Sequence, residues 1–511
     1  MEYIKTQWIY FLNHHPRKTI FITFFSIYTL CTFERLQKAS NNNHFAYLAQ
    51  SLMAGQTSLL NPPPHGNDWA SYEVLTLKGK ALKRVQQKSS SLSNPIKGVY
   101  RVKRQPKGRQ NYTFQTLNGS QLRIYPSDII KRERRYFVSF PPFPSILLLP
   151  LVYFFGLAAS DVWLTLFFAA FNALLAYELF KLVYSTRRQQ VASTPKQTKL
   201  LEDDTRNALW LTASLGLGTA HFWCAVRGEV WYTALIIGLS CQLLFFKYAW
   251  HLRNPLLAGL AYAAAFSTRA SLITLALFAY IQVFSSSVHP HFKERVKKLV
   301  YFSIPPLTVG IVLLYYNYIR FEKLHEFGHR YLAGGQLQRI AEYGLFHWVF
   351  LKKNLIAAFL LLPKFSFSLP ILIYSWHGMA IQFSSPQLLW SFLPPLKTTH
   401  LSENKSHHPK HIFQFITDSN IHRTGLYLVL ISTFTLLIFY QNTGWVQYSW
   451  RFVIDLLPAL FLLFVINGRT ISLWLKLAII WGILINLFGA IAFGRSSLWW
   501  EGLNLPQLLP H

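Results

Sequence analysis

The sequence predicts an all-α protein that crosses a membrane many times, and three observations support this fold class. Hydrophobic residues make up 52% of the 511-residue chain, whereas charged residues make up only 14%. Apolar runs recur along the chain and are bounded by Lys, Arg, Trp and Tyr, as is typical of transmembrane helices with interfacial anchors. A single long polar loop separates the first apolar run from the others.

We expect about eleven transmembrane helices, because a crossing needs about 20 mostly apolar residues. The first follows Arg17 and Lys18 and has no small-residue cleavage site nearby, so we interpret it as a retained span rather than a signal peptide. The expected spans are 19–33, 161–184, 207–225, 230–249, 254–268, 270–285, 299–318, 384–396, 424–440, 451–467 and 472–493.

The apolar run 143–156 is too short for a crossing, and we expect it to lie along the membrane surface. The basic loops 185–206, 286–298 and 397–423 then all face the cytoplasm, as the positive-inside rule favours. The first loop consequently faces outward, and we expect a bacterial inner-membrane protein whose active side is extracytoplasmic. The chain is then divided into five parts: the N-terminus with the first span (1–33), the first loop (34–160), the helical core (161–318), the second outer loop (319–383) and the C-terminal spans (384–511).

The first loop is strongly basic. Between Lys78 and Arg135 it holds sixteen Lys and Arg residues but only two acidic residues. Alternating residues from Tyr112 to Leu117, followed by Asn-Gly, predict a small β-hairpin. An amphipathic stretch near the start of the loop predicts a surface helix. This order, in which one span is followed by one large polar loop and then by many spans, favours a reaction at the membrane surface over simple transport of a substrate across the membrane.

The formal charge of +30 does not require nucleic acid as a partner. Anionic lipid headgroups attract basic loops at roughly 1 kcal/mol per nearby Lys or Arg, so membrane lipids explain the charge, and no nucleic-acid recognition module is evident. The three cysteines, all in apolar segments, form neither a disulfide framework nor a zinc spacing. Nucleotide-binding and hydrolase motifs are not found in the sequence.

Polar residues at span ends fall on the outer side in this topology. Arg227 and Glu229 occupy a tight break between spans, where they form either a solvated turn or part of an outward cavity. Arg451 and Asp455 are four residues apart, so they would share a helix face and could pair, either structurally or at a site.

Two further groups allow alternative readings. Arg320 and Arg330, the latter followed by Tyr331, are either interfacial anchors or clamps for phosphate, which guanidinium groups bind bidentately. His44 follows three asparagines at a helix start, where it could cap the helix or hydrogen-bond a sugar.

Five short motifs, in this order, resemble those of the polytopic GT-C glycosyltransferases. The resemblance is to bacterial relatives of the family 39-like mannosyltransferases that use dolichyl- or polyprenyl-phosphate sugars, and it spans most of the chain. The motifs are 43–49 (NHFAYLA), 139–144 (SFPPFP), 227–230 (RGEV), 316–321 (YNYIRF) with 326–328 (EFG), and 441–448 (QNTGWVQY) with Arg451 and Asp455.

The resemblance implies an inverting transfer of a sugar from a polyprenyl-phosphate donor to a lipid, glycan or protein acceptor outside the cytoplasm. It also implies a carboxylate at the start of the first outer loop that acts as base or orients the acceptor. This chain has Asn41, Asn42 and Asn43 there, and an amide cannot accept a proton at neutral pH. Glu34, His44, Asp68 or Glu229 would have to substitute, and we favour Asp68 and Glu229.

The expected site contains three catalytic candidates, Asp68, Glu229 and His44. No metal-ligand set is evident, although a divalent cation remains open as a cofactor. Two other functions stay open, a catalytically silent relative of these enzymes and a transporter or flippase of lipid-linked glycans. The expected substrate-binding residues are Asn42, Asn43, Arg227, Arg320, Arg330, Tyr331, Gln447, Arg451 and Asp455.

Overall fold

The chain divides into two compact units in the computed structural model. The first unit comprises Met1–Asn41, Ser160–Leu307 and Phe346–His511, and the second comprises Asn42–Ala159 and Thr308–Leu345. The structure describes residues 14–87, 93–104, 110–189, 197–283, 291–332, 336–367, 372–394, 418–495 and 500–501.

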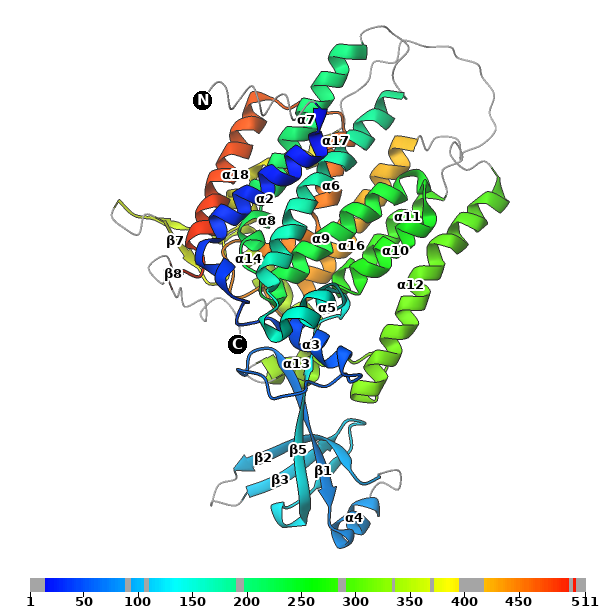
Figure 1. The fold of residues 1–511 in the computed structure, drawn as a ribbon, viewed down its shortest axis with the longest axis vertical. Helices are drawn as coiled ribbons and strands as arrows, with labels where there is room; N and C mark the ends of the chain where they lie inside the picture. Colours follow the sequence, from blue (N-terminus) through cyan, green and yellow to red (C-terminus); the bar gives the residue numbers. More distant parts are fainter. Residues whose placement is uncertain are drawn as a thin grey trace. The chain divides into compact units, whose positions relative to one another are not determined.

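The first unit is a bundle of helices, of which α6, α9 and α10 lie side by side (Figure 1). The helix α9 is apolar on all sides and is buried along most of its length, as expected of a helix at the centre of a bundle. The α-helices are α2 (Pro16–Thr32), α6 (Asp161–Gln189), α7 (Gln197–Leu217), α8 (His221–Ala225), α9 (Val230–Ala249), α10 (Pro255–Phe266), α11 (Ala276–Gln282), α14 (Leu351–Phe359), α15 (Ile381–Ser384), α16 (Asp418–Phe439), α17 (Leu457–Ile466) and α18 (Leu473–Ala492).

Short 3-10 helices and a small sheet complete the first unit. The strand β7 pairs with β6 antiparallel and with β8 parallel. A long helix, α12 (Phe292–Phe321), begins in the first unit and ends in the second. The remaining elements are η1 (Phe33–Gln37), η4 (Trp250–Leu252), η5 (Ala270–Leu275), η7 (Trp348–Phe350), η8 (Pro386–Phe392), η10 (Arg451–Asp455), β6 (Lys364–Phe365), β7 (Leu372–Ser375) and β8 (Trp500–Glu501).

Within the described residues, six helices are long and apolar enough to cross a membrane, rather than the eleven expected. The expected span 207–225 is divided between α7 and α8, and the span 270–285 begins as the 3-10 helix η5. The expected span 384–396 contains the seven-residue η8, which at about 2 Å per residue is much shorter than a hydrocarbon core of about 30 Å. The six helices are Pro16–Gln37, Asp161–Thr186, Val230–Leu252, Phe292–Phe321, Asn420–Phe439 and Leu473–Ala492.

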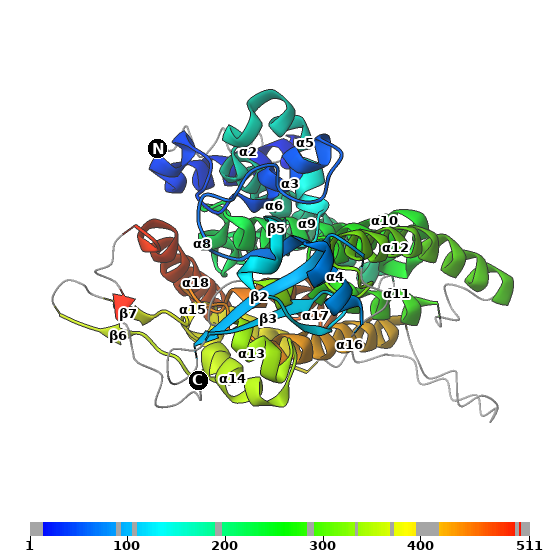
Figure 2. The same ribbon diagram turned by 90° about the horizontal axis from the view of Figure 1, so that it is seen from below.

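The second unit is built around a five-stranded sheet of order β4-β3-β2-β1-β5, in which every neighbouring pair is antiparallel. The strands β2 and β3 lie side by side in Figure 2. Its elements are α3 (His44–Met53), β1 (Trp69–Leu77), α4 (Gly79–Gln86), β2 (Ile96–Arg104), β3 (Gln110–Thr116), β4 (Gln121–Arg123), η2 (Pro126–Asp128), β5 (Ile129–Val138), α5 (Phe143–Phe155), η3 (Gly156–Ala158), η6 (His329–Tyr331) and α13 (Gln336–Tyr343).

The stretch for which a small hairpin is expected therefore belongs to a larger sheet. Strands β3 and β4 pair across a turn in which Gly119 adopts φ +102°, a conformation that a residue with a Cβ rarely adopts. In β3 and β4 the buried Phe114 and Leu122 each lie between more exposed polar neighbours, and α4 buries Ala81 and Val85 while exposing its cations. The basic region thus has its own core, formed by Leu75, Leu77, Ala81, Val85, Ile96, Phe114, Leu122 and Ile124.

Candidate functional site

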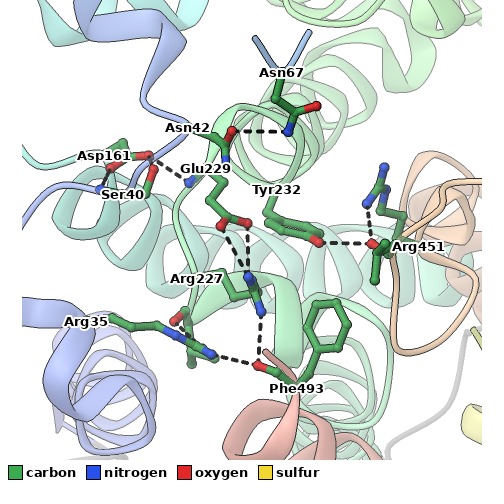
Figure 3. A network of polar contacts seen from close by, with 12 residues as sticks. Arg35, Ser40, Asn42, Asn67, Asp161, Arg227, Glu229, Tyr232, Arg451 and Phe493 are labelled. Carbon is green, nitrogen blue, oxygen red and sulfur yellow. Dashed lines mark hydrogen bonds and ion pairs between the residues drawn. The ribbon is translucent and has the colours of Figure 1, made fainter. Parts of the chain in front are cut away.

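A buried carboxylate organises the polar network of the first unit (Figure 3). Asp161, the first residue of α6, is only 1% exposed. Its carboxylate accepts hydrogen bonds from Ser40 N at 2.9 Å, Ser40 Oγ at 2.5 Å and Glu229 N at 2.7 Å. The helix dipole also favours an acidic residue in the first turn. Asp161 therefore joins the segment after η1 to the turn before α9.

The turn before α9 adopts a conformation that its sequence alone would not favour. Gly228 has φ +72°, and a Cβ there would lie 2.9 Å from Val162 Cγ2. Glu229 has φ +69°, which is uncommon for a residue other than glycine. The hydrogen bond from Glu229 N to Asp161 holds this strained residue, and such strain is frequent at functional sites.

Arg227 connects Glu229 to the end of α18. Its Nη2 contacts both carboxylate oxygens of Glu229, at 3.1 and 3.2 Å, and its Nη1 donates to the carbonyl of Phe493 at 3.0 Å. Arg35 Nη2 donates to the same carbonyl at 2.6 Å. A Cβ on Gly494 would lie 2.2 Å from Arg227 Nη1, so only glycine permits this approach. Arg227 and Glu229, both expected at this turn, thus pair with each other, and Arg35 lies beside them as a second arginine.

Tyr232, on the first turn of α9, lies between two arginines (Figure 3). The Cζ atoms of Arg227 and Arg451 are 5.1 and 5.2 Å from the centroid of its ring. The Tyr232 hydroxyl and Arg451 Nη1 both donate to the carbonyl of Val446, at 3.2 and 3.1 Å. This arrangement brings the predicted residues Arg227, Glu229 and Arg451 into one network.

The network carries more positive charge than its carboxylates balance. Arg451 is only 4% exposed, and no carboxylate of the described residues pairs with it. The Nε atoms of Arg451 and Arg227 are also buried without a hydrogen-bond acceptor in that part of the chain. Buried charges are normally paired, because removing a charge from water is costly. An anionic ligand would supply the missing charge.

Gln447 and Asp455 have internal partners. Gln447 Nε2 donates to the carbonyls of His377 and Thr443, both at 2.8 Å, and its Oε1 accepts from Arg451 N. Asp455 pairs with Arg269 rather than with Arg451, because residues 451–455 form a 3-10 helix, whose three residues per turn do not align positions four apart.

Arg269 binds Asp455 through Nε at 2.9 and 3.1 Å and through Nη2 at 2.8 Å. Ser271 Oγ is a third donor to the Asp455 carboxylate, at 2.7 Å. Sequence reasoning did not select Arg269, or Asp161. The sequence does contain a signal for both residues: Arg269 is a single charged residue between two apolar runs, and Asp161 is one directly before an apolar run.

An apolar groove of about 450 Å³ lies in the first unit and is lined by residues of α14, α15, η8, α16, η10 and α17. One lining residue, Val453, belongs to the same short helix as Arg451. The lining includes Phe359, Leu388, Leu430, Phe434, Val453 and Leu460.

His44 is fully buried in the second unit, and both ring nitrogens contact main-chain carbonyls. Nδ1 lies 3.0 Å from Asn42 O, and Nε2 lies 3.1 Å from Asn67 O. The ring stacks on Trp69 at 3.8 Å between centroids. Both nitrogens are thus occupied by main-chain acceptors, an arrangement suited to positioning the loop.

Asn43 caps α3 and also donates a hydrogen bond. Its Oδ1 accepts from Ala46 N at 3.3 Å, and its Nδ2 donates to Ala159 O at 2.8 Å. Only an amide can make both contacts, which explains an Asn rather than an Asp at this position. Asn42, by contrast, accepts a side-chain hydrogen bond from the exposed Asn67 at 3.4 Å (Figure 3).

Asp68, like Glu229, is a carboxylate with a positive φ, in this case +57°. It is half-buried and lies in the second unit near His329. Burial lowers the pKa of His329 to about 4, and the nearby Arg320 acts in the same direction, whereas Asp68 opposes the shift.

Arg320 and Arg330 differ sharply in their surroundings. Arg320 is 2% exposed and donates to Val138 O and Asn317 Oδ1, both at 2.8 Å. The side chain of Arg330 is 62% exposed and lies 3.5 Å from Glu326. Tyr331 stacks on Phe321 at 5.2 Å between ring centroids. Arg320 is therefore committed to the fold, whereas Arg330 can reach a ligand.

The described helices fit a multi-pass membrane protein. Comparison with protein-family models, curated proteins and solved structures finds no match to this chain. In the described ranges, no three His, Cys, Asp or Glu side chains are grouped as a metal site would require.

Proposed function

We propose that this chain is a membrane glycosyltransferase that moves a sugar from a polyprenyl-phosphate donor to a lipid, glycan or protein acceptor on the extracytoplasmic side. The observation that carries the proposal is the buried guanidinium of Arg451, which no carboxylate of the described residues balances. A donor phosphate bound there would supply the missing negative charge. Arg227, whose guanidinium also lies against the Tyr232 ring, would add a second cation.

The apolar groove supports a polyprenyl carrier rather than a soluble sugar phosphate. Its volume lies within the usual range for ligand sites, and its lining presents apolar surface throughout. Val453 of the groove and Arg451 share η10, so one short element would contact both the carrier chain and its phosphate.

Glu229 is the proposed base of the first unit. In the transfer step the acceptor oxygen bonds to the anomeric carbon and gives its proton to the Glu229 carboxylate. The bond between that carbon and the phosphate oxygen breaks, and the phosphate leaves with the electron pair. Arg451 would stabilise the charge that develops on the leaving phosphate. Two contacts support this role: the ion pair with Arg227 holds the carboxylate in place, and the hydrogen bond from the main-chain N–H of Glu229 to Asp161 holds the backbone that carries it.

Asp68 remains the second candidate for the base, and its positive φ supports a positioned role. The test is transfer of labelled sugar from a polyprenyl-phosphate donor by the purified protein in detergent. We expect Glu229→Gln to remove turnover while leaving donor binding within about twofold of wild type. Full turnover in Glu229→Gln with loss in Asp68→Asn would reassign the base. Full turnover in both single variants and in their combination would contradict a carboxylate base, and no turnover with any donor would favour a silent relative.

A further inference from the structure

The basic region of the second unit contains a cavity that the donor site does not use. The cavity measures about 400 Å³ and lies between the strands β2, β3 and β4 on one side and the described residues of 323–331 and 340–344 on the other. This volume is within the range of small-molecule sites. We propose that it binds an acidic saccharide, a sugar that carries carboxylate or phosphate groups.

The charge of the lining favours an anion. Lys323 and Arg330 both line the cavity, and among the described residues no acidic side chain does. Lys323 makes no hydrogen bond or ion pair through its ammonium group within the described ranges. The one ion pair of Arg330 within the described part of the chain is the 3.5 Å contact to Glu326, and its side chain is largely exposed. Two cations that the protein leaves weakly paired can each bind an anionic oxygen.

The remaining lining favours a sugar over a bare anion. Gln115, from β3, and Gln121, from β4, present amides that can donate to and accept from hydroxyl groups. Tyr331 supplies an aromatic side chain and Ile340 an apolar one, which suits the carbon face of a sugar ring. The combination of amides, an aromatic ring and cations is the lining that an acidic saccharide requires.

Exposed cations elsewhere on this region would attract the same ligand from solution. Lys78, Lys80 and Lys83 at α4 and Arg123 on β4 are exposed, and none forms an ion pair with a carboxylate in the part of the chain that is described. A surface of one charge sign raises the local concentration of oppositely charged ligands. The basic insertion thereby gains a binding role, and its ligand would be the acceptor only if the proposed transferase function holds.

The test measures binding by calorimetry with the full-length protein in detergent and no donor. The probes are trigalacturonate, glucose 6-phosphate and the neutral maltotriose. We expect binding of at least one acidic probe, a loss of about tenfold or more in affinity for Lys323→Gln combined with Arg330→Gln, and a smaller loss for Gln121→Leu. The matched pair Lys80→Gln with Lys83→Gln removes the same charge from outside the cavity lining, where the cations act only by weak long-range attraction, so its affinity should stay within about threefold of wild type.

Binding of trigalacturonate alone would assign carboxylated sugars, and binding of glucose 6-phosphate alone would assign phosphorylated ones. The proposal fails if maltotriose binds as tightly as the acidic probes, if no acidic probe binds, or if the α4 pair weakens binding as much as the cavity pair. Near-identical melting temperatures confirm that the variants are folded, and Gln121→Leu provides the test if the cavity pair is not. The assay involves no sugar transfer, so its failure is distinct from failure of the proposed function.

Discussion

The main-chain N–H of Glu229 donates to the carboxylate of Asp161 at 2.7 Å, so one carboxylate sets the position of another. Asp161 is almost fully buried, and the Glu229 side chain is 17% exposed. The two groups therefore have different tasks: the buried carboxylate of Asp161 determines the backbone conformation, and the more accessible carboxylate of Glu229, which Arg227 holds, is the proposed base.

Asp161→Asn should lower both stability and turnover. The amide nitrogen of the new asparagine is a donor, and it would face another donor, either Ser40 N or the N–H of Glu229, so one hydrogen bond would be lost. A buried hydrogen bond to a charged group contributes about 1.5–3 kcal/mol to stability. We expect the melting temperature in detergent to fall by several degrees, and sugar transfer to fall with it. Glu133→Gln, at an exposed ion pair with Arg135, should change neither, and an unchanged Asp161→Asn protein would refute the structural role.

Replacing Asn by Asp at two adjacent positions at the start of the first loop should have different effects on stability. Asn43→Asp keeps the helix cap but turns a donor into an acceptor facing Ala159 O, so we expect a loss of about 1–3 kcal/mol in stability. Asn42→Asp should be tolerated, because Asn42 contacts an exposed asparagine. Thermal melts of both variants check this pair. Equal tolerance at the two positions would contradict the assigned hydrogen bond.

Replacing Arg269 should lower stability, whereas replacing Arg451 should not. Arg269→Gln leaves Asp455, whose side chain is fully buried, without its ion pair, and breaking such a pair costs about 3–5 kcal/mol. Arg451→Gln removes a buried cation that lacks a carboxylate partner among the described residues, so stability should change little or rise. Melting temperatures in matched detergent check the contrast. A large loss for Arg451→Gln would mean that this arginine is structural.

Stability should decline as the pH falls from about 6.5 toward 4, in part because of His329. Burial lowers its folded pKa to about 4 from an ordinary value of 6.5, so the unfolded chain binds more protons in this window. Protonation therefore favours unfolding there, and the contribution is fully present above about pH 6.5. His329→Gln should reduce the acid loss of melting temperature, whereas the exposed His325→Gln should not. A wild-type slope in His329→Gln would contradict the burial argument.

The sequence was informative where single residues carry unusual chemistry. Its apolar runs predict the helical membrane class. Its charged residues beside those runs, which require partners, predict Arg227, Glu229 and Arg451 as site candidates, and the structure brings these three into one network. The eleven expected spans are not confirmed: six of the described helices are long and apolar enough to cross a membrane, and the short apolar run 384–396 contains the 3-10 helix η8.

Other features depend on contacts between distant segments. Asp161 meets Ser40 across 121 residues, and Arg269 meets Asp455 across 186, and no local pattern encodes either pair. Alternation in residues 112–117, followed by Asn-Gly, predicts only a small hairpin within the basic first loop. Only the packing of alternate residues reveals the five-stranded sheet.

The most direct test of the donor site is equilibrium binding of a polyprenyl monophosphate to the purified protein. Wild type should bind it, and Arg451→Gln should bind at least about tenfold more weakly while melting at or above the wild-type temperature. Arg469→Gln removes an arginine that, among the described residues, donates to the carbonyl of Pro394 and pairs with no carboxylate, so this variant should bind as wild type does. Equal affinity in wild type and Arg451→Gln, or no binding by either, would contradict a phosphate site at Arg451.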